Sequence, residues 1–129
     1  MKTVFKNKLY KNSAIEIRRS DKDEGGWGVF ARRNIKKHSI LEQSPVIVVD
    51  IERISQISQC YKYSYGFDQE NVMIGMGFAG FYNHSFNPNA EWGDDRVNMI
   101  MEHYACRDIL AGEEICINYG EENVDFEVK

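Results

Sequence analysis

Three short segments carry residue types that could do chemistry: residues 24–31 (EGGWGVFA), 80–90 (GFYNHSFNPNA) and 112–120 (GEEICINYG). The glycines of the first segment would let a backbone approach a ligand closely, or would form a hairpin turn. His84 in the second segment is a candidate ligand or base, and Tyr119 in the third is a candidate catalyst. Taken alone, His84 is more often a structural histidine, and Tyr119 is more often a packed aromatic. No single segment decides the chemistry.

The polar loop at residues 83–89 has two simpler readings. Asn and Ser side chains bond their own backbone and Pro88 fixes one dihedral, so the loop could be only a turn. Its first three residues, Asn-His-Ser, also spell an acceptor for N-glycosylation. That reading needs a secretory route, and the N-terminal residues show no apolar signal segment. We therefore expect an intracellular protein.

The three cysteines bear on the compartment and on metal binding. Cys60, Cys106 and Cys116 are an odd number and have no C-x-x-C spacing. This argues against a disulfide framework and against a closed zinc site. We expect no metal.

Composition limits the class of protein. A chain of 129 residues, with 43% hydrophobic and 28% charged residues, is typical of one globular domain, which we expect to be residues 1–129. No stretch is long and apolar enough to span a membrane. The formal net charge of -4 disfavours binding along a nucleic-acid backbone and favours a basic partner.

The elements that must position the three segments are mostly strands. Alternating and β-branched runs predict strands at residues 14–20, 28–33, 40–50 and 115–119. Residues 90–108 predict a hairpin around the turn residues Gly93–Asp95. Pro45 suits an edge or a bulge, because it has no N–H to donate to a neighbouring strand. Asp50 is expected to cap one helix at residues 51–63, where isoleucines recur at helical spacing.

In this order and with these separations, the three segments resemble the signature of SET-domain protein lysine methyltransferases. That family shows a Gly-x-Gly stretch running into a strand, an Asn-His-Ser-x-x-Pro-Asn segment, and a Gly-Glu-Glu strand that ends in Tyr-Gly. The matching residues here are 26–31, 83–89 and 112–120. The resemblance covers about residues 15–122, leaves 123–129 as a short tail, and is closest to small single-domain SET proteins of some viruses and bacteria.

The resemblance implies both a fold and a reaction. The fold would be β-clip-like, with several small sheets, one or two short helices and a knot-like threading of the C-terminal segment near the Asn-His loop. The reaction would be methyl transfer from S-adenosylmethionine to a lysine side chain of a basic protein or peptide, with a histone tail as one candidate. The compartment would be the cytoplasm, or the host nucleus for a virus-encoded protein.

The resemblance also assigns roles to residues. The cofactor would lie against Gly26, Trp27, Gly28, Asn83 and His84. Tyr119 would be the catalytic tyrosine that orients the amine and the cofactor. A second tyrosine would line the lysine channel; Tyr65 fits best, with Tyr63 as the alternative.

Departures from the family pattern concern the ends of the domain and one turn. The cysteine-rich zinc segments that flank many larger SET enzymes are absent from this sequence. His38 stands where relatives often have the glycine of a Lys-Gly turn. SET sites need a C-terminal aromatic to close the cofactor pocket, so either Phe126 or a second subunit of a homodimer is expected to supply that cover.

Two other functions compete with the methyltransferase. A SET-like fold could serve as a non-catalytic peptide-binding module, although the retained Tyr119 and cofactor loop argue against this. A cysteine hydrolase could use Cys106 or Cys116 with His84, but nothing beside these cysteines resembles an oxyanion hole.

Overall fold

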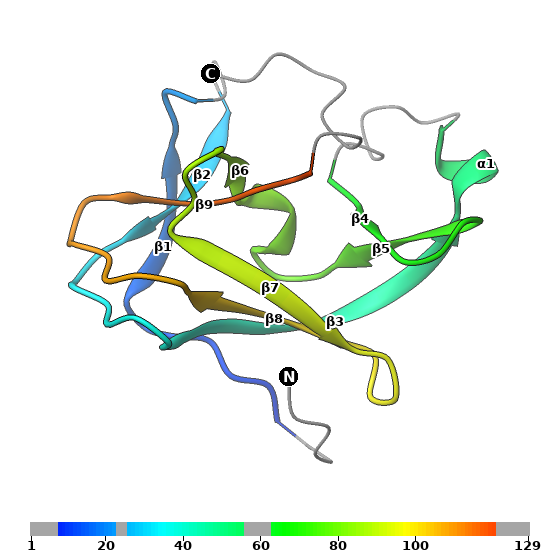
Figure 1. Cartoon of the computed structure of the whole chain (residues 1–129), viewed down its shortest axis with the longest axis horizontal. Helices are drawn as coiled ribbons and strands as arrows, with labels where there is room; N and C mark the ends of the chain where they lie inside the picture. Colours follow the sequence, from blue (N-terminus) through cyan, green and yellow to red (C-terminus); the bar gives the residue numbers. More distant parts are fainter. Residues whose placement is uncertain (1–7, 23–25, 56–62, 121–129) are drawn as a thin grey trace.

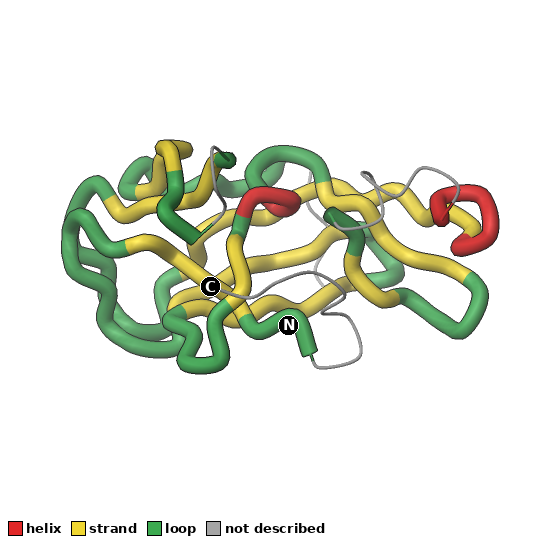
Figure 2. The backbone as a smooth tube through the Cα atoms, turned by 90° about the horizontal axis from the view of Figure 1, so that it is seen from above, coloured by secondary structure: helices red, strands yellow, loops and turns green. Residues whose placement is uncertain are grey.

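The computed structural model describes residues 8–22, 26–55 and 63–120. In this part of the chain the elements are, in order, β1 (Ile15–Arg19), β2 (Trp27–Ala31), β3 (Ile40–Asp50), α1 (Ile51–Ser55), β4 (Tyr65–Gly66), β5 (Asn71–Gly75), the 3-10 turn η1 (Ala79–Phe81), β6 (Asn83–His84), β7 (Ala90–Asp95), β8 (Ile100–Ala105) and β9 (Glu114–Ile117). Figure 2 shows that strands and loops form most of the described chain, with the two short helical segments far apart. The prediction of a mostly β fold is confirmed.

The strands form two sheets (Figure 1). One has the order β1-β2-β9-β6, and the other has the order β4-β5-β3-β8-β7. Neighbouring strands are antiparallel except β6 and β9, which are parallel. The second and third sequence segments, which are far apart in the chain, therefore meet at the β6–β9 pair.

β3 is the longest strand, and it changes partner along its length. Its first half pairs with β8 up to Pro45, which is opposite Ile100, and its second half pairs with β5 from Val46 onward. The expectation that Pro45 lies at an edge or a bulge is wrong, because β3 is the middle strand and its register shift lies between Ile40 and Glu42. Proline is tolerated here because only its carbonyl is used, as the acceptor for the Met76 N–H at 2.9 Å.

The predicted helix begins where expected. The Glu52 N–H donates to Asp50 Oδ1 at 2.8 Å, so Asp50 caps α1. The described helix ends at Ser55; residues 56–62 of the predicted span lie outside the described residues, and Tyr63 lies in a turn. The prediction that the helix includes Tyr63 is therefore wrong.

The predicted hairpin is present, but its turn lies further along the chain. Gly93–Asp95 pair with β8, and the turn is formed by residues 96–99. The Asp95 carboxylate accepts the N–H groups of Val97 and Asn98 at 3.0 and 3.1 Å, and Met99 has a positive φ of 54°. The expected turn position was wrong because the side chain of Asp95 organises the residues that follow it.

The turn before β3 keeps the conformation that a glycine would adopt. His38 has a φ of 75°, in the left-handed region that favours glycine, and its N–H donates to the Ala105 carbonyl at 2.8 Å. Histidine in place of the glycine that relatives often have therefore leaves the turn in place and strains the backbone of His38.

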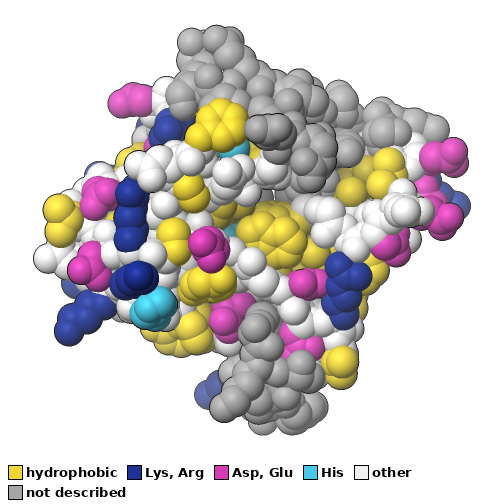
Figure 3. Space-filling view, in the orientation of Figure 1, with side chains coloured by type: hydrophobic (Ala, Val, Ile, Leu, Met, Phe, Trp, Pro, Cys, Tyr) yellow, Lys and Arg dark blue, Asp and Glu magenta, His cyan; other side chains and the backbone are white. Residues whose placement is uncertain are grey.

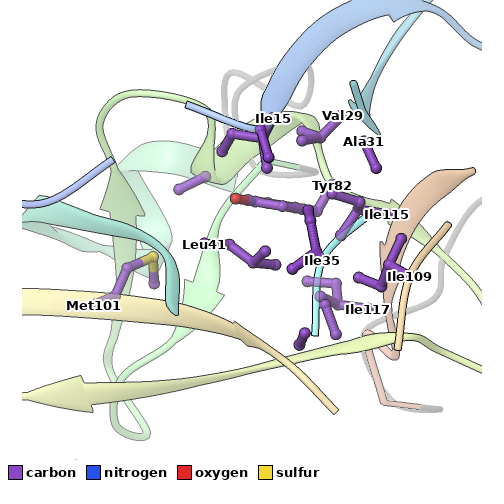
Figure 4. Close-up of a cluster of buried hydrophobic side chains, with 14 of the residues drawn as sticks. Ile15, Val29, Ala31, Ile35, Leu41, Tyr82, Met101, Ile109, Ile115 and Ile117 are labelled. Atoms are coloured by element: carbon purple, nitrogen blue, oxygen red, sulfur yellow. The ribbon is translucent and has the colours of Figure 1, made fainter. Parts of the chain in front are cut away.

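The hydrophobic core lies between the two sheets. Its side chains come from β1, β2 and β9 of one sheet, from β3 and β8 of the other, and from the loops that join them (Figure 4). The labelled members are Ile15, Val29, Ala31, Ile35, Leu41, Tyr82, Met101, Ile109, Ile115 and Ile117. Each large aliphatic side chain buried in this way contributes about 1.5 to 3 kcal/mol to the stability of the fold.

Among the described residues, no helix is long and apolar enough to cross a bilayer.

Candidate active site

The two C-terminal sequence segments are joined by backbone pairing and by one buried amide. Asn83 is opposite Cys116 and His84 is opposite Ile117 in the β6–β9 pair. The side chain of Asn89, which is 4% exposed, accepts the Cys116 N–H at 2.9 Å and donates to the Glu114 carbonyl at 2.9 Å. Asn89 thus fixes the loop of residues 83–89 against β9. The sequence predicted only that the Asn side chains of this loop form its turn.

Asn83 belongs to a polar cluster that also contains Ser20 and Glu114. Its Nδ2 lies 2.7 Å from Glu114 Oε2, 3.1 Å from Ser20 Oγ and 3.1 Å from the Trp27 carbonyl. Ser20 Oγ donates to Glu114 Oε1 at 2.7 Å. The amide N–H groups of Asn83 are thereby used within the protein, while its Oδ1 accepts no hydrogen bond from the described residues. That oxygen is available to a ligand donor.

Gly28 leaves room for this polar cluster. A Cβ at position 28 would overlap Glu114 Oε2 and would lie 3.0 Å from Asn83 Nδ2. The sequence reasoning ascribed this glycine to close approach of a cofactor to the backbone. The structure gives it a second reason, the close approach of two protein side chains.

Gly26 and Trp27 of the first segment lie beside the polar cluster, while Val29 and Ala31 are buried in the core. The Gly26 carbonyl accepts the Ser20 N–H at 3.1 Å, and the Trp27 side chain is 44% exposed. The Arg19 guanidinium carbon lies 4.1 Å from the centroid of the Trp27 ring. The Trp27 ring therefore lies at the surface and is not a member of the buried core cluster.

His84 ties the loop to the segment that holds the expected catalytic tyrosine. Its ring is buried, and Nδ1 accepts the Tyr119 N–H at 2.9 Å, so Nε2 carries the ring proton. Nε2 is buried and has no hydrogen-bond partner among the described residues. Burial, and then the charge of Lys22, lower the pKa of His84, so the neutral ring is favoured.

Tyr65 and Tyr119 both bind the short turn at residues 79–82, which lies between them in the sequence. The Tyr119 hydroxyl donates to the Tyr82 carbonyl at 2.6 Å, and the Tyr65 hydroxyl donates to the Ala79 carbonyl at 2.6 Å. Burial, and then the neighbouring Tyr119 phenol, raise the pKa of Tyr65 well above its ordinary value. Tyr63 instead is 39% exposed. The structure brings Tyr65, and not Tyr63, into the interior beside Tyr119.

A buried network that sequence reasoning missed supports this turn. It consists of Glu42, Tyr65, Tyr82 and His103. Glu42 is 1% exposed; its carboxylate accepts the Tyr82 hydroxyl at 3.0 Å and the Phe78 N–H at 2.8 Å. Burial raises the pKa of Glu42, although the nearby donors and Lys11 oppose this. In the sequence, Glu42 is one of several polar residues of β3 and His103 follows Glu102 in β8, so nothing in the sequence singles out this pair.

The remaining sequence candidates are not brought into the site as reactive groups. Phe126 lies outside the described residues. Burial raises the pKa of Cys106, and it raises that of Cys116 to about 12, so neither thiol is activated as a hydrolase would need. In residues 8–22, 26–55 and 63–120, no three His, Cys, Asp or Glu side chains are grouped to hold a metal ion.

The free polar atoms suit a ligand that is both cationic and polar. Asn83 Oδ1 is an acceptor for an ammonium group, the Glu114 carboxylate lies beside it, and the Nε2–H of His84 is an unused buried donor. In the space-filling view, hydrophobic side chains gather near β7 with acidic side chains beside them (Figure 3). These features fit the amino acid part of S-adenosylmethionine, and they fit a basic substrate.

The chain is similar to known proteins in sequence and in structure. The SET domain family model matches residues 26–120. A histone-lysine N-methyltransferase of Schizosaccharomyces pombe, described as specific for H3 lysine 37, is 33% identical over 112 residues, covering 84% of this chain and 75% of that protein. A crystal structure from Plasmodium falciparum, described as a candidate histone methyltransferase, matches with a TM-score of 0.68 and 32% identity, covering 85% of this chain and 96% of that chain.

Neither relative bears on the expected likeness to viral or bacterial proteins. The family match includes residues 26–31 of the first segment and the whole of the other two segments. The chain belongs to the SET domain family.

Proposed function

We propose that this SET protein transfers methyl groups from S-adenosylmethionine to a lysine side chain of a histone, at the site between Asn83, Tyr119 and Tyr65. The observation that carries the proposal is the double attachment of Tyr119. Its backbone N–H is bound to His84 in the cofactor loop, and its phenol is bound to the Tyr82 carbonyl. Tyr119 is held by its backbone and by its hydroxyl, between the loop of residues 83–89 and the buried phenol of Tyr65. A tyrosine fixed in this way is positioned for catalysis.

The polar cluster would hold the cofactor. Asn83 Oδ1 would accept from the amino group of S-adenosylmethionine, and Glu114 would favour its positive charge. The Nε2–H of His84 would donate to an acceptor on the cofactor. When bound, S-adenosylmethionine supplies an activated methyl group on a sulfonium.

The tyrosines would prepare the lysine. A free lysine has a pKa of about 10.4, so its amine is almost entirely protonated near neutral pH and cannot attack a methyl group. Entry into a site walled by the buried Tyr65 and Tyr119 would lower that pKa by desolvation. The Tyr119 phenol would orient the amine, and no strong base is required.

A histone is proposed as substrate on two grounds. The Schizosaccharomyces pombe relative is described as a histone H3 lysine methyltransferase. The net charge of -4 favours a basic peptide, and acidic side chains lie beside the hydrophobic area in Figure 3. A nuclear or cytoplasmic location would follow from such a substrate.

Closure of the site is a separate part of the proposal. Either Phe126 or a second copy of the chain would cover the lysine channel, because a hydrated ammonium keeps its proton. Loss of activity on dilution would favour a partner subunit.

The experiment that tests the proposal uses the full chain with isotopically labelled S-adenosylmethionine and separate recombinant histones. Labelled lysine in a histone, located by mass spectrometry, is the expected result. Parallel reactions with histones that carry a Lys→Arg change at the labelled position should lose the signal. No labelled histone, in a preparation that binds S-adenosylmethionine by calorimetry, would contradict the substrate; no binding would contradict the cofactor.

A further inference from the structure

The hydroxyl of Tyr65 has two protein partners, and together they determine where its proton lies. Its oxygen is 2.6 Å from the Ala79 carbonyl oxygen and 2.9 Å from His103 Nε2. Two oxygens at 2.6 Å need a proton between them, and a phenol has only one. The Tyr65 proton is therefore donated to Ala79, and Nε2 of His103 must carry its own proton and donate it to Tyr65.

The ring of His103 is held so that it can make this contact. His103 is fully buried, and it stacks on Tyr82 with a centroid distance of 4.2 Å and an interplanar angle of 13°. Tyr82 is in turn fixed by Glu42, which is the cross-strand neighbour of His103 in the β3–β8 pair. Burial lowers the pKa of His103 to about 3, so the ring is neutral at working pH.

The unused nitrogen of His103 strengthens the argument. Nδ1 is buried and has no hydrogen-bond partner among the described residues. Among the described residues, the hydrogen bond to Tyr65 is the one that this ring makes. This bond is therefore what a histidine contributes at this position.

These contacts leave the Tyr65 oxygen with a single role toward a ligand. Its proton is committed to Ala79 and one lone pair to His103, so at most one lone pair is left to accept. An amine in the channel offers one N–H fewer for each methyl group that it has received. A fixed acceptor phenol therefore binds an unmethylated amine better than a methylated one, and it also occupies the space that a further methyl group would need.

We propose that His103 positions the Tyr65 phenol and thereby limits how many methyl groups the site adds to one lysine. This inference rests on the proposed function, because it needs Tyr65 to line the lysine channel. His103 is a positioning residue, since it acts through Tyr65.

The first test compares product distributions for the parent, H103F, H103Q, Y65F and the double variant H103F/Y65F. Each full chain is given the labelled histone, and mass spectrometry measures the ratio of multiply to singly methylated lysine. H103F keeps an aromatic ring against Tyr82 and lacks the N–H, so its ratio should rise about three- to tenfold, in the same direction as Y65F. H103Q retains an N–H donor and should stay within about twofold of the parent.

The double variant separates positioning from general loosening of the fold. If His103 acts through Tyr65, H103F/Y65F should give the same ratio as Y65F alone, because the phenol is already absent. A further change in the double variant, or an unchanged ratio in H103F, would overturn the inference.

A second measurement needs no activity. Nitrogen NMR of the histidine-labelled parent at pH 7 should show His103 as the neutral Nε2–H tautomer, and Y65F should shift its Nε2–H signal. An Nδ1–H tautomer would overturn the inference even if the chain methylates histones. The expected tautomer with a parent that transfers no methyl group would contradict the proposed function instead, and with it the effect on products.

Discussion

The polar cluster and the buried network use their polar atoms differently. In the polar cluster, Asn83 is half-buried and keeps an unused oxygen beside the carboxylate of Glu114. In the buried network, Glu42 and His103 are almost fully buried, and their bonds to Tyr82 and Tyr65 are made within the protein. The first arrangement leaves an acceptor oxygen for a ligand, and in the second Glu42 and His103 hold Tyr82 and Tyr65 in place.

This difference predicts two kinds of variant. Changes in the polar cluster should alter cofactor affinity more than stability. Changes in the buried network should alter stability or the products of the reaction, with little direct effect on cofactor affinity.

The largest effect is expected at Glu42. The variant Glu42→Ala leaves the Tyr82 hydroxyl and the Phe78 N–H buried without their acceptor, so it should lower the free energy of unfolding by about 3 to 5 kcal/mol. Urea denaturation measures the change. The matched control is Glu70→Ala, at an exposed carboxylate, which should change stability by less than about 0.5 kcal/mol. Equal stability of the two variants would contradict the structural role of the network.

A smaller effect is expected at Asn83, and on a different quantity. Asn83→Ala removes the acceptor oxygen and one side of a polar pair, so it should weaken S-adenosylmethionine binding by about 1 to 3 kcal/mol. Calorimetry measures the affinity, and Asn87→Ala, at an exposed position of the same loop, is the control. Unchanged affinity in a folded Asn83→Ala protein would remove the polar cluster from the cofactor site.

The pH dependence of stability tests the buried network again. The unfolded state binds a proton at His103 below about pH 6.5, and the folded state resists this until about pH 3, so this stability is full above 6.5 and is lost as pH falls. At pH 5 the parent should have lost about 2 kcal/mol more than His103→Gln, at about 1.4 kcal/mol per pH unit.

The comparison with His103→Gln isolates one group from others that titrate nearby. The raised pKa of Glu42 acts in the opposite sense: that stability is present below its unfolded pKa and is lost as pH rises through the folded pKa. Glu42 is present in both proteins, so its contribution cancels to first order. Parallel pH profiles for the two proteins would show that His103 titrates normally.

The smallest effect is expected at Gly28. A methyl group here displaces the Glu114 carboxylate, which is the end of a flexible side chain, so Gly28→Ala should weaken S-adenosylmethionine binding about three- to tenfold with little loss of stability. Gly66→Ala is the control, because a Cβ at Gly66 meets nothing within 4 Å. If both variants bind the cofactor like the parent, the packing of Gly28 against the polar cluster has no functional role.

The polar cluster could be predicted from the sequence in part, and the buried network could not. Asn83, His84 and Tyr119 lie in contiguous motifs, so their types and spacing can be read directly. Glu42 and His103 lie among other polar residues in separate strands, 61 positions apart by their residue numbers. Only the register of β3 against β8 makes them neighbours, and register depends on long-range packing.

The errors in the fold have the same origin. Alternation correctly predicted β1, because side-chain periodicity is local, and the strand predicted at residues 40–50 matches β3 although buried and exposed residues do not alternate along it. The expectation that Pro45 lies at an edge or a bulge was wrong because its position in the sheet depends on where β3 exchanges one partner strand for another. The turn of the β7–β8 hairpin was misplaced because Asp95 pairs in β7 and also caps the following turn.

Single-turnover methyl transfer by Tyr119→Phe, at saturating S-adenosylmethionine, tests most directly whether Tyr119 acts in catalysis and the polar cluster in cofactor binding. The change removes only the hydroxyl that binds the Tyr82 carbonyl and leaves the backbone bond to His84. The rate should fall about 100-fold through lost positioning, while cofactor affinity should stay within about threefold of the parent. A rate close to that of the parent, or a loss confined to cofactor affinity, would contradict the assignment of Tyr119 to catalysis.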